Sequence, residues 1–245
     1  MSKPHFDARG LARSITAAAM LCFTAIIVPA RAPRPQSEAP KYEMGTFYLC
    51  LLVKGPNFVA TPEAQQLQAH LKHVQGLFAG GKAVLFGPFG DDDRIAGVAV
   101  LDASSPEEAR SLEEQDPFVK SGRFSIEVLK WWAAKNVIKP PPNPLKMTTY
   151  YLAFLRHGPK WTGQSTPETQ KIQADHMANI NAMARTGKLV IAGPFEIGGD
   201  YAGLFVFKVK TLDEAKALAD SDPAVRAGRL VADVHPWRIA EGSLP

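Results

Sequence analysis

Cysteine is scarce in this chain of 245 residues, which contains only Cys22 and Cys50. We expect Cys22 to be removed with an N-terminal targeting segment, so the mature protein cannot form an intramolecular disulfide. Cys50 stands within an apolar run, 48–53, and this predicts a buried and unreactive thiol. A fold that depends on disulfides is therefore excluded.

Motifs of several common chemistries are also absent. The sequence has no Cys-x-x-Cys, no His-Glu-x-x-His, no Walker-type phosphate loop and no Gly-x-Ser-x-Gly nucleophile elbow. Asp91-Asp92-Asp93 lacks the spacing of a calcium loop and is typical of a turn. The sequence thus predicts neither a metal nor an organic cofactor.

A strong charge of either sign is missing as well. The net charge is +4, and residues 1–32 carry four basic residues against one acidic residue, so the mature chain is near +1. No basic patch is interleaved with aromatic residues. We therefore expect a small-molecule ligand as the partner and no nucleic acid.

The N-terminus has the pattern of a signal peptide. Three basic residues precede a nearly uncharged stretch, 14–29, and Ala30-Arg31-Ala32 supplies small residues at a cleavage site. We expect cleavage after Ala32, a periplasmic or secreted product, and membrane contact only during export. An uncleaved anchor is the alternative, although the apolar run is at the short end for a span of about 20 residues.

The chain does contain an internal repeat at an offset of 106 residues. Gly87-Pro88-Phe89 recurs as Gly193-Pro194-Phe195, and Asp116-Pro117 recurs as Asp222-Pro223. A single offset that holds from the middle of each copy to its end indicates a tandem duplication of a unit of roughly 90 residues.

Each repeat predicts the order strand, helix, strand, strand, helix, strand. In the first, we expect strands at 46–54, 83–86, 95–101 and 124–131 and helices starting at Thr61-Pro62 and Ser105-Pro106; in the second, strands at 150–156, 189–192, 203–209 and 230–237 and helices at 167–185 and 212–219. This βαββαβ order is the ferredoxin-like arrangement of the α+β class. Two such units could pack the bare faces of their sheets together as a closed barrel.

Proline-rich segments set the expected domain boundaries. We expect a disordered leader at 33–45, a first domain at 46–138, a linker at 139–146 and a second domain at 147–240. A proline-rich run favours an extended, semi-rigid conformation. Because this linker is short, the two domains must lie close together.

The repeated motifs resemble the YCII-related domain. Both copies, at about 48–132 and 150–238, contain an early Gly-Pro, a first-helix histidine, Gly-Lys, Gly-Pro-Phe, Asp-Pro and a terminal tryptophan. The family is similar in fold to the dimeric α+β barrels, which implies an intramolecular pseudo-dimer and leaves further oligomerisation open. The resemblance also implies a His–Asp active site, since some relatives act as lyases or isomerases on small cyclic or aromatic breakdown products.

Carried onto this chain, the pairs are His70 with Asp116 and His176 with Asp222. A histidine oriented by a carboxylate can remove a proton next to a carbonyl or ring hydroxyl. We expect a cofactor-independent enzyme of the lyase or isomerase type, with each pair in a barrel cavity. A non-catalytic ligand-binding module and a purely structural one are the alternatives, because a histidine can make one structural hydrogen bond and an aspartate before proline is a favoured helix cap.

Four further residues are candidates for substrate contacts. Phe89 and Phe195 follow Gly-Pro dipeptides that we expect to form turns, and their rings could line the cavity. Lys54 and His157 both precede a Gly-Pro dipeptide and could hold an anionic substrate. Solvated surface charges and packing are the alternatives for these residues.

The two repeats are not identical. Phe118 corresponds to Ala224, and His73 corresponds to Asn179. If both sites worked, their pocket walls would differ, and one of the two sites could be degenerate.

Overall fold

The computed structural model describes residues 42–92, 94–197 and 199–245. The predicted signal peptide and most of the predicted leader lie outside the described residues. Within the described ranges, no helix is long and apolar enough to cross a membrane. The segment Ala39–Pro245, which holds both repeats, forms one compact unit.

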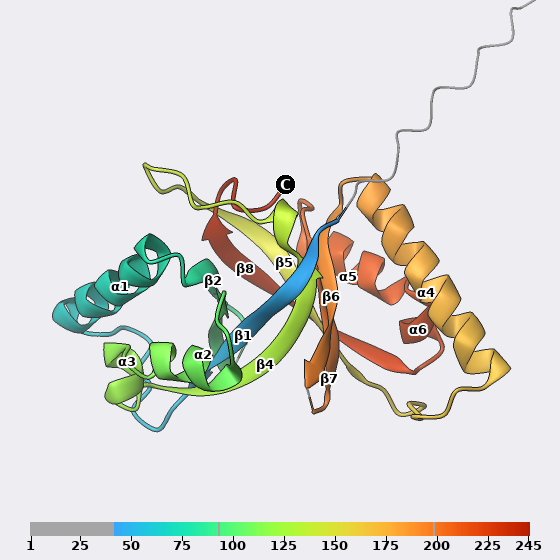
Figure 1. The fold of residues 1–245 in the computed structure, drawn as a ribbon, viewed down its shortest axis with the longest axis horizontal. Helices are drawn as coiled ribbons and strands as arrows, with labels where there is room; N and C mark the ends of the chain where they lie inside the picture. The colour runs from blue at the N-terminus through green and yellow to red at the C-terminus, as the bar shows by residue number, and fades with distance from the viewer. Residues whose placement is uncertain (1–41, 93, 198) are drawn as a thin grey trace, which may run out of the picture. The chain divides into compact units, whose positions relative to one another are not determined.

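The two repeats contain the same elements in the same order (Figure 1). The first consists of β1 (Met44–Lys54), α1 (Ala64–Ala79), β2 (Ala83–Pro88), β3 (Ile95–Leu101), α2 (Pro106–Glu113), α3 (Pro117–Lys120) and β4 (Phe124–Ala134), followed by a 3₁₀ turn, η1 (Lys135–Val137). The second consists of β5 (Met147–His157), α4 (Pro167–Arg185), β6 (Leu189–Ile197), β7 (Tyr201–Phe207), α5 (Leu212–Asp220), α6 (Pro223–Arg226) and β8 (Leu230–Ala240). The predicted βαββαβ order is confirmed, with a short extra helix after the second helix of each repeat.

Capping residues set the start of most helices. Ser105 caps α2 as predicted, since the backbone N–H of Glu108 donates to its Oγ at 3.1 Å. Thr166 caps α4 through a reciprocal capping box with Thr169. The start predicted for α1 at Thr61-Pro62 is wrong: α1 begins at Ala64, after an extended residue that makes no side-chain cap.

Each repeat folds into a four-stranded antiparallel sheet, and the two sheets join. The strand order is β2-β3-β1-β4-β6-β7-β5-β8. At one seam β4 pairs with β6 through Trp131 and Phe195. At the other end of this order, an isolated bridge joins Phe89, just after β2, to Trp237 of β8. The two seams therefore join equivalent strands of the two repeats and close the sheet into an α+β barrel.

The repeated Gly-Pro-Phe motifs lie at these seams, so their interpretation as turns is wrong. The indole N–H of Trp237 donates to the carbonyl oxygen of Gly87 at 3.0 Å, and that of Trp131 donates to Gly193 at 3.2 Å. A side chain at Gly87 would collide with the backbone oxygen of Arg238, and one at Gly193 would meet the backbone of β4 in the same way. Glycine is needed here because two strands approach closely.

Alternation along the strands divides the core into layers. On β5, Leu152 and Phe154 face the space between the sheets, whereas Ala153 and Leu155 face the helices. The space between the sheets is filled by buried apolar side chains, among them Phe47, Leu49, Leu51, Phe89, Trp131, Tyr150, Phe195, Leu204 and Trp237. Helices α1–α3 and α4–α6 cover the opposite faces of their sheets (Figure 1).

Candidate functional site

A histidine and an aspartate meet in each repeat, between the first helix and the short third helix. His70 Nδ1 lies 2.6 Å from Asp116 Oδ2, and His176 Nδ1 lies 2.8 and 2.9 Å from the two oxygens of Asp222. Both aspartates are fully buried, and both histidines are buried as well. The predicted contact within each pair is therefore present, on the helix-covered face of each sheet. The expected position in a cavity between the sheets is wrong, because apolar side chains fill that space.

Each aspartate also caps a helix. The backbone N–H of Phe118 donates to Asp116 Oδ1 at 2.8 Å, and that of Ala224 donates to Asp222 Oδ1 at 2.9 Å. The two predicted roles, capping and pairing, thus coexist in one carboxylate. Each carboxylate accepts a hydrogen bond from the Nδ1–H group of its histidine. Nε2 is then the ring nitrogen that can accept a proton.

The pKa of Asp222 is lowered from its ordinary value by its partners. Burial alone would raise this pKa, but the hydrogen bond and charge of His176 and a hydrogen bond from Asn179 outweigh the burial. Asn179 Nδ2 donates to Asp222 Oδ2 at 3.1 Å. The carboxylate therefore stays ionised and holds the imidazole in one orientation.

Aromatic rings cover the pair of the first repeat. Phe118 stacks on His70 with ring centroids 4.4 Å apart, and Phe86 and Phe124 lie at 5.6 and 6.4 Å. In the second repeat Ala224 replaces Phe118, and the one ring stacked on His176 within the described residues is Phe205 at 5.9 Å. The pocket walls of the two repeats differ, as the substitution predicts.

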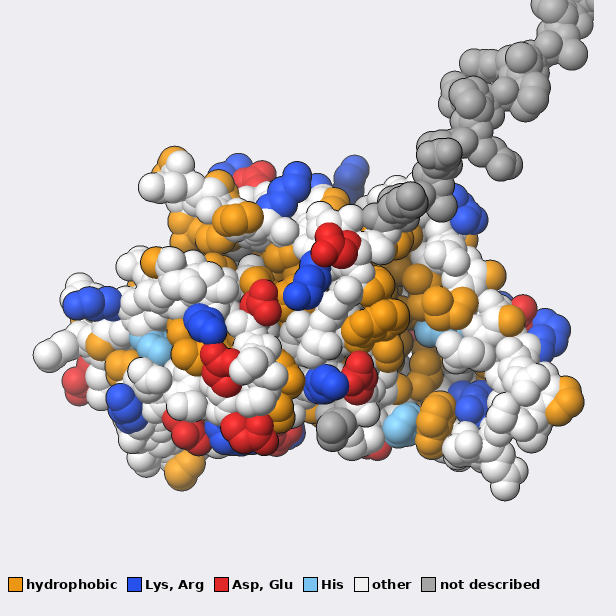
Figure 2. Space-filling model, in the orientation of Figure 1, with side chains coloured by type: hydrophobic (Ala, Val, Ile, Leu, Met, Phe, Trp, Pro, Cys, Tyr) orange, Lys and Arg blue, Asp and Glu red, His pale blue; other side chains and the backbone are white. Residues whose placement is uncertain are grey.

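A cavity of about 370 Å³ opens beside His176, between α4 and strands β6 and β7. Figure 2 shows a hollow on this face along which hydrophobic side chains gather. Its polar side chains include Gln173, His176 and Asn181, and none of the described lining residues is a lysine or an arginine. The aromatic residues that line it are Tyr42, Trp132, Trp161 and Phe205.

The four predicted substrate contacts lie elsewhere. Phe89 and Phe195 belong to the core between the sheets. Lys54 Nζ donates to the backbone oxygen of Asp92 at 2.7 Å, and His157 stacks on Trp161 at 4.1 Å between ring centroids. None of the four is among the cavity-lining residues, because their strand positions direct them to the core or the strand ends. The expectation that the rings of Phe89 and Phe195 line a ligand cavity is therefore wrong.

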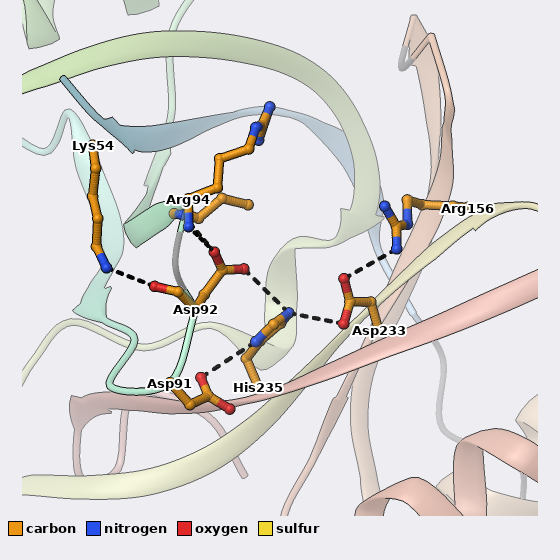
Figure 3. A network of polar contacts seen from close by, with 8 residues as sticks. Lys54, Asp91, Asp92, Arg94, Arg156, Asp233 and His235 are labelled. Carbon is orange, nitrogen blue, oxygen red and sulfur yellow. Dashed lines mark hydrogen bonds and ion pairs between the residues drawn. The ribbon is translucent and has the colours of Figure 1, made fainter. Parts of the chain in front are cut away.

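Sequence reasoning missed a polar network around His235, in the middle of β8 (Figure 3). Its Nδ1 lies 3.3 Å from Asp91, and its Nε2 lies 3.2 Å from Asp233 and 3.5 Å from Asp92. The ring also stacks on Phe89 at 5.1 Å. Asp91 and Asp92, which belong to a segment predicted as a simple turn, thus supply carboxylates to a buried imidazole.

The carboxylates of this network raise the pKa of His235. Burial disfavours its charged form, but the hydrogen bond and charge of Asp233 and the charges of Asp91 and Asp92 outweigh burial. Leu129 occupies the equivalent position of the first repeat, so the duplication offers no signal for this histidine.

Glu113 is the second site residue that sequence reasoning missed. It is fully buried at the end of α2, four residues after the buried Ala109. Burial, and then the charge of Asp116, raise the pKa of Glu113 to about 8. The available signal was a glutamate on the apolar side of a short helix, where the second repeat has Ala219.

Known proteins share this architecture. The YCII-related domain matches residues 46–132 and 149–238, one match for each repeat. The chain belongs to the YCII-related domain family. Protein YjpA of Bacillus subtilis (strain 168) is 30% identical over 84 residues, which cover 34% of this chain and 92% of YjpA. One YCII-related domain of this chain therefore corresponds to nearly the whole of that relative.

Two solved structures resemble the tandem of YCII-related domains as a whole. A chlorite dismutase variant from Candidatus Nitrospira defluvii aligns with a TM-score of 0.54 at 10% identity, over 82% of this chain and 93% of its own. The putative chlorite dismutase TA0507 aligns with a TM-score of 0.54 at 9% identity, over 81% and 96%. At these identities the likeness shows the fold, an α+β barrel made by one chain.

Proposed function

We propose that the second YCII-related domain is a small-molecule site in which His176 transfers protons, in chemistry of the lyase or isomerase type. One observation carries the proposal: His176 is fixed through Nδ1 by Asp222 and borders a cavity of about 370 Å³. The first domain has the same pair but covers its histidine with Phe118.

The arrangement supports general acid–base catalysis. With the Nδ1 proton donated to Asp222, Nε2 can accept a proton from a carbon next to a carbonyl or from a ring hydroxyl. The imidazolium that forms is stabilised by the buried carboxylate, as in other His–Asp pairs. Return of this proton to another atom of the substrate completes an isomerisation, and its delivery to a departing group completes an elimination.

The cavity wall favours a small, largely apolar substrate. Its volume is at the lower end of the roughly 300–1,000 Å³ of ligand sites. Trp132 and Trp161 offer flat apolar surfaces, while Gln173 and Asn181 offer hydrogen bonds that could orient a carbonyl group. Because the described lining residues include no lysine or arginine, we infer a neutral ring-sized molecule in place of an anion.

Substitution of the proposed base tests this function. Neutral unsaturated lactones and cyclic enones, which carry acidic C–H groups, would be screened for an absorbance change with wild-type protein. His176→Gln should reduce turnover by at least about 100-fold, because general acid–base catalysis contributes roughly 10²–10⁴-fold. Lys171→Gln is the control, since Lys171 lies on α4, is exposed and pairs only with Asp175 on the surface within the described residues.

The outcomes separate the rival functions. A compound that binds in the cavity and is never converted would favour a non-catalytic binding module. Loss of turnover in His70→Gln but not in His176→Gln would place the chemistry in the first domain. Equal turnover in wild type and in His176→Gln would refute a catalytic role for His176.

We propose further that residues 1–32 direct export and are cleaved after Ala32. The support is the sequence pattern of basic, apolar and small residues. N-terminal sequencing of protein recovered from the periplasm or medium should begin at Pro33. A membrane-bound chain that still begins at Met1 would show that the segment is an anchor.

A further inference from the structure

Three ionisable side chains converge in the first YCII-related domain, beside its His–Asp pair. His73 comes from α1, Glu113 ends α2, and Asp116 begins α3. One nitrogen of His73 and one oxygen of each carboxylate all lie within 4.8 Å of one another. Three separate helical segments therefore aim potential ligand atoms at one point.

Polar atoms at this point lack partners. Glu113 and Asp116 are both 0% exposed. Neither carboxylate oxygen of Glu113, nor Nε2 of His73, has a hydrogen-bond partner among the described residues. Burying polar atoms without partners costs free energy, and native proteins satisfy nearly all such groups. A partner at this point would have to satisfy a carboxylate and an imidazole together.

The neighbouring hydrogen bonds hold Asp116 in place. The backbone N–H of Phe118 donates to its Oδ1 at 2.8 Å, and His70 Nδ1 lies 2.6 Å from its Oδ2. Hydrogen bonds of this kind orient the carboxylates that ligate metal ions. These two hydrogen bonds use part of the accepting capacity of Asp116. The remaining lone pairs of its carboxylate are free for a further partner.

The second domain shows that the fold does not require the cluster. Asn179 occupies the position of His73, and Ala219 that of Glu113. There Asn179 donates directly to Asp222 at 3.1 Å, so that carboxylate is satisfied by protein atoms. The first domain has an imidazole in place of this amide donor and adds a carboxylate, and a cation would satisfy both.

We propose that His73, Glu113 and Asp116 bind a divalent transition-metal ion of the zinc class. One imidazole and two carboxylates form a donor set suited to Zn²⁺. Ligand atoms about 2.1 Å from one such ion lie about 3.4 Å apart in a tetrahedral site, so small side-chain rotations bring the three atoms together. The ion would link α1, α2 and α3 and stabilise the first domain, independently of the chemistry proposed for the second.

Metal titration of the untagged full chain tests the site. After dialysis against EDTA, Zn²⁺ would be added in a calorimeter and in a thermal-unfolding assay, and Co²⁺ would be followed by its visible absorbance. Wild type should bind one ion per chain and gain a higher melting temperature. The double variant His73→Asn/Glu113→Ala copies the second domain, and its affinity should fall by more than about 100-fold.

Two further variants make the result decisive. Glu113→Gln keeps the volume of the side chain and should also weaken binding, so it replaces the double variant if that chain does not fold. Glu114→Gln changes an exposed neighbour at the end of α2 and should bind as wild type does. The proposal is overturned if wild type binds neither ion, or if Glu113→Gln and the double variant bind with wild-type stoichiometry and affinity.

Discussion

The seams between the two YCII-related domains predict a large effect from a very small substitution. In Gly87→Ala the new Cβ would lie well inside van der Waals distance of the Arg238 backbone oxygen, where ordinary contact begins at 3.4 Å. The two strands would have to separate by about 1.4 Å. This shift breaks the 3.0 Å hydrogen bond from Trp237 to Gly87 and leaves buried groups unpaired.

The free energy of unfolding should fall by about 2–6 kcal/mol in this variant. A broken, buried hydrogen bond contributes about 1–3 kcal/mol, and overpacking adds about 1–3 kcal/mol. Gly193→Ala should cost a similar amount, because Gly193 meets the backbone oxygen of Trp132 in the same geometry. Urea denaturation followed by tryptophan fluorescence would measure both, since Trp131 and Trp237 lie at the seams.

Gly90→Ala is the matched control for this experiment. Gly90 lies three residues after Gly87, and nothing lies within 4 Å of a Cβ at this position. Its unfolding free energy should stay within about 0.5 kcal/mol of wild type, as for most surface substitutions. If Gly87→Ala and Gly193→Ala behaved like Gly90→Ala, the closure of the barrel by close strand approach would be refuted.

Two further predictions concern α1 and His235. Gly76→Ala should stabilise the protein by about 0.5–1 kcal/mol in thermal unfolding, because Gly76 is an exposed helical position in the last turn of α1 with open space around it. Destabilisation would show that α1 is not a regular helix there. The raised pKa of His235 gives stability that is fully present below its ordinary pKa of 6.5 and is lost as the pH rises through the raised value. His235→Leu, which introduces the residue of the first domain, should flatten this part of the stability–pH profile in urea denaturation, and an unchanged slope would contradict the network.

The duplication explains which parts of the structure could be predicted from the sequence. The His–Asp pairs were accessible because both members recur at one offset. The Gly-Pro-Phe motifs recur too, but their geometry depends on a tryptophan 150 residues away in one case, and no local pattern reports that contact. Local propensity favours a turn at Gly-Pro, and the approach of a distant strand overrides it.

The cavity could not be predicted for a related reason. Its existence depends on how closely α4 packs on the sheet, which the periodicity of a helix does not specify. The sequence shows that Ala224 stands where the first repeat has Phe118. Whether the ring of Phe118 covers His70 depends on the direction of that ring, which the sequence does not specify. Glu113 and His235 lack counterparts in the other domain, so the comparison of repeats, which found the pairs, could not find them.

Under the two proposals above, a pair that recurs in both domains serves two purposes after duplication. In both, the aspartate must cap its short helix, so neither copy can lose it without losing the cap. What differs is the surroundings. In the second domain, Asn179 and the backbone N–H of Ala224 donate hydrogen bonds to Asp222, and a cavity lies next to His176. In the first domain, Phe118 covers His70, and potential ligand atoms of His73 and Glu113 lie close to Asp116. A base needs an accessible nitrogen, and a buried cation needs ligands without other partners. For these reasons we propose chemistry on a ligand in the second domain and a stabilising ion in the first.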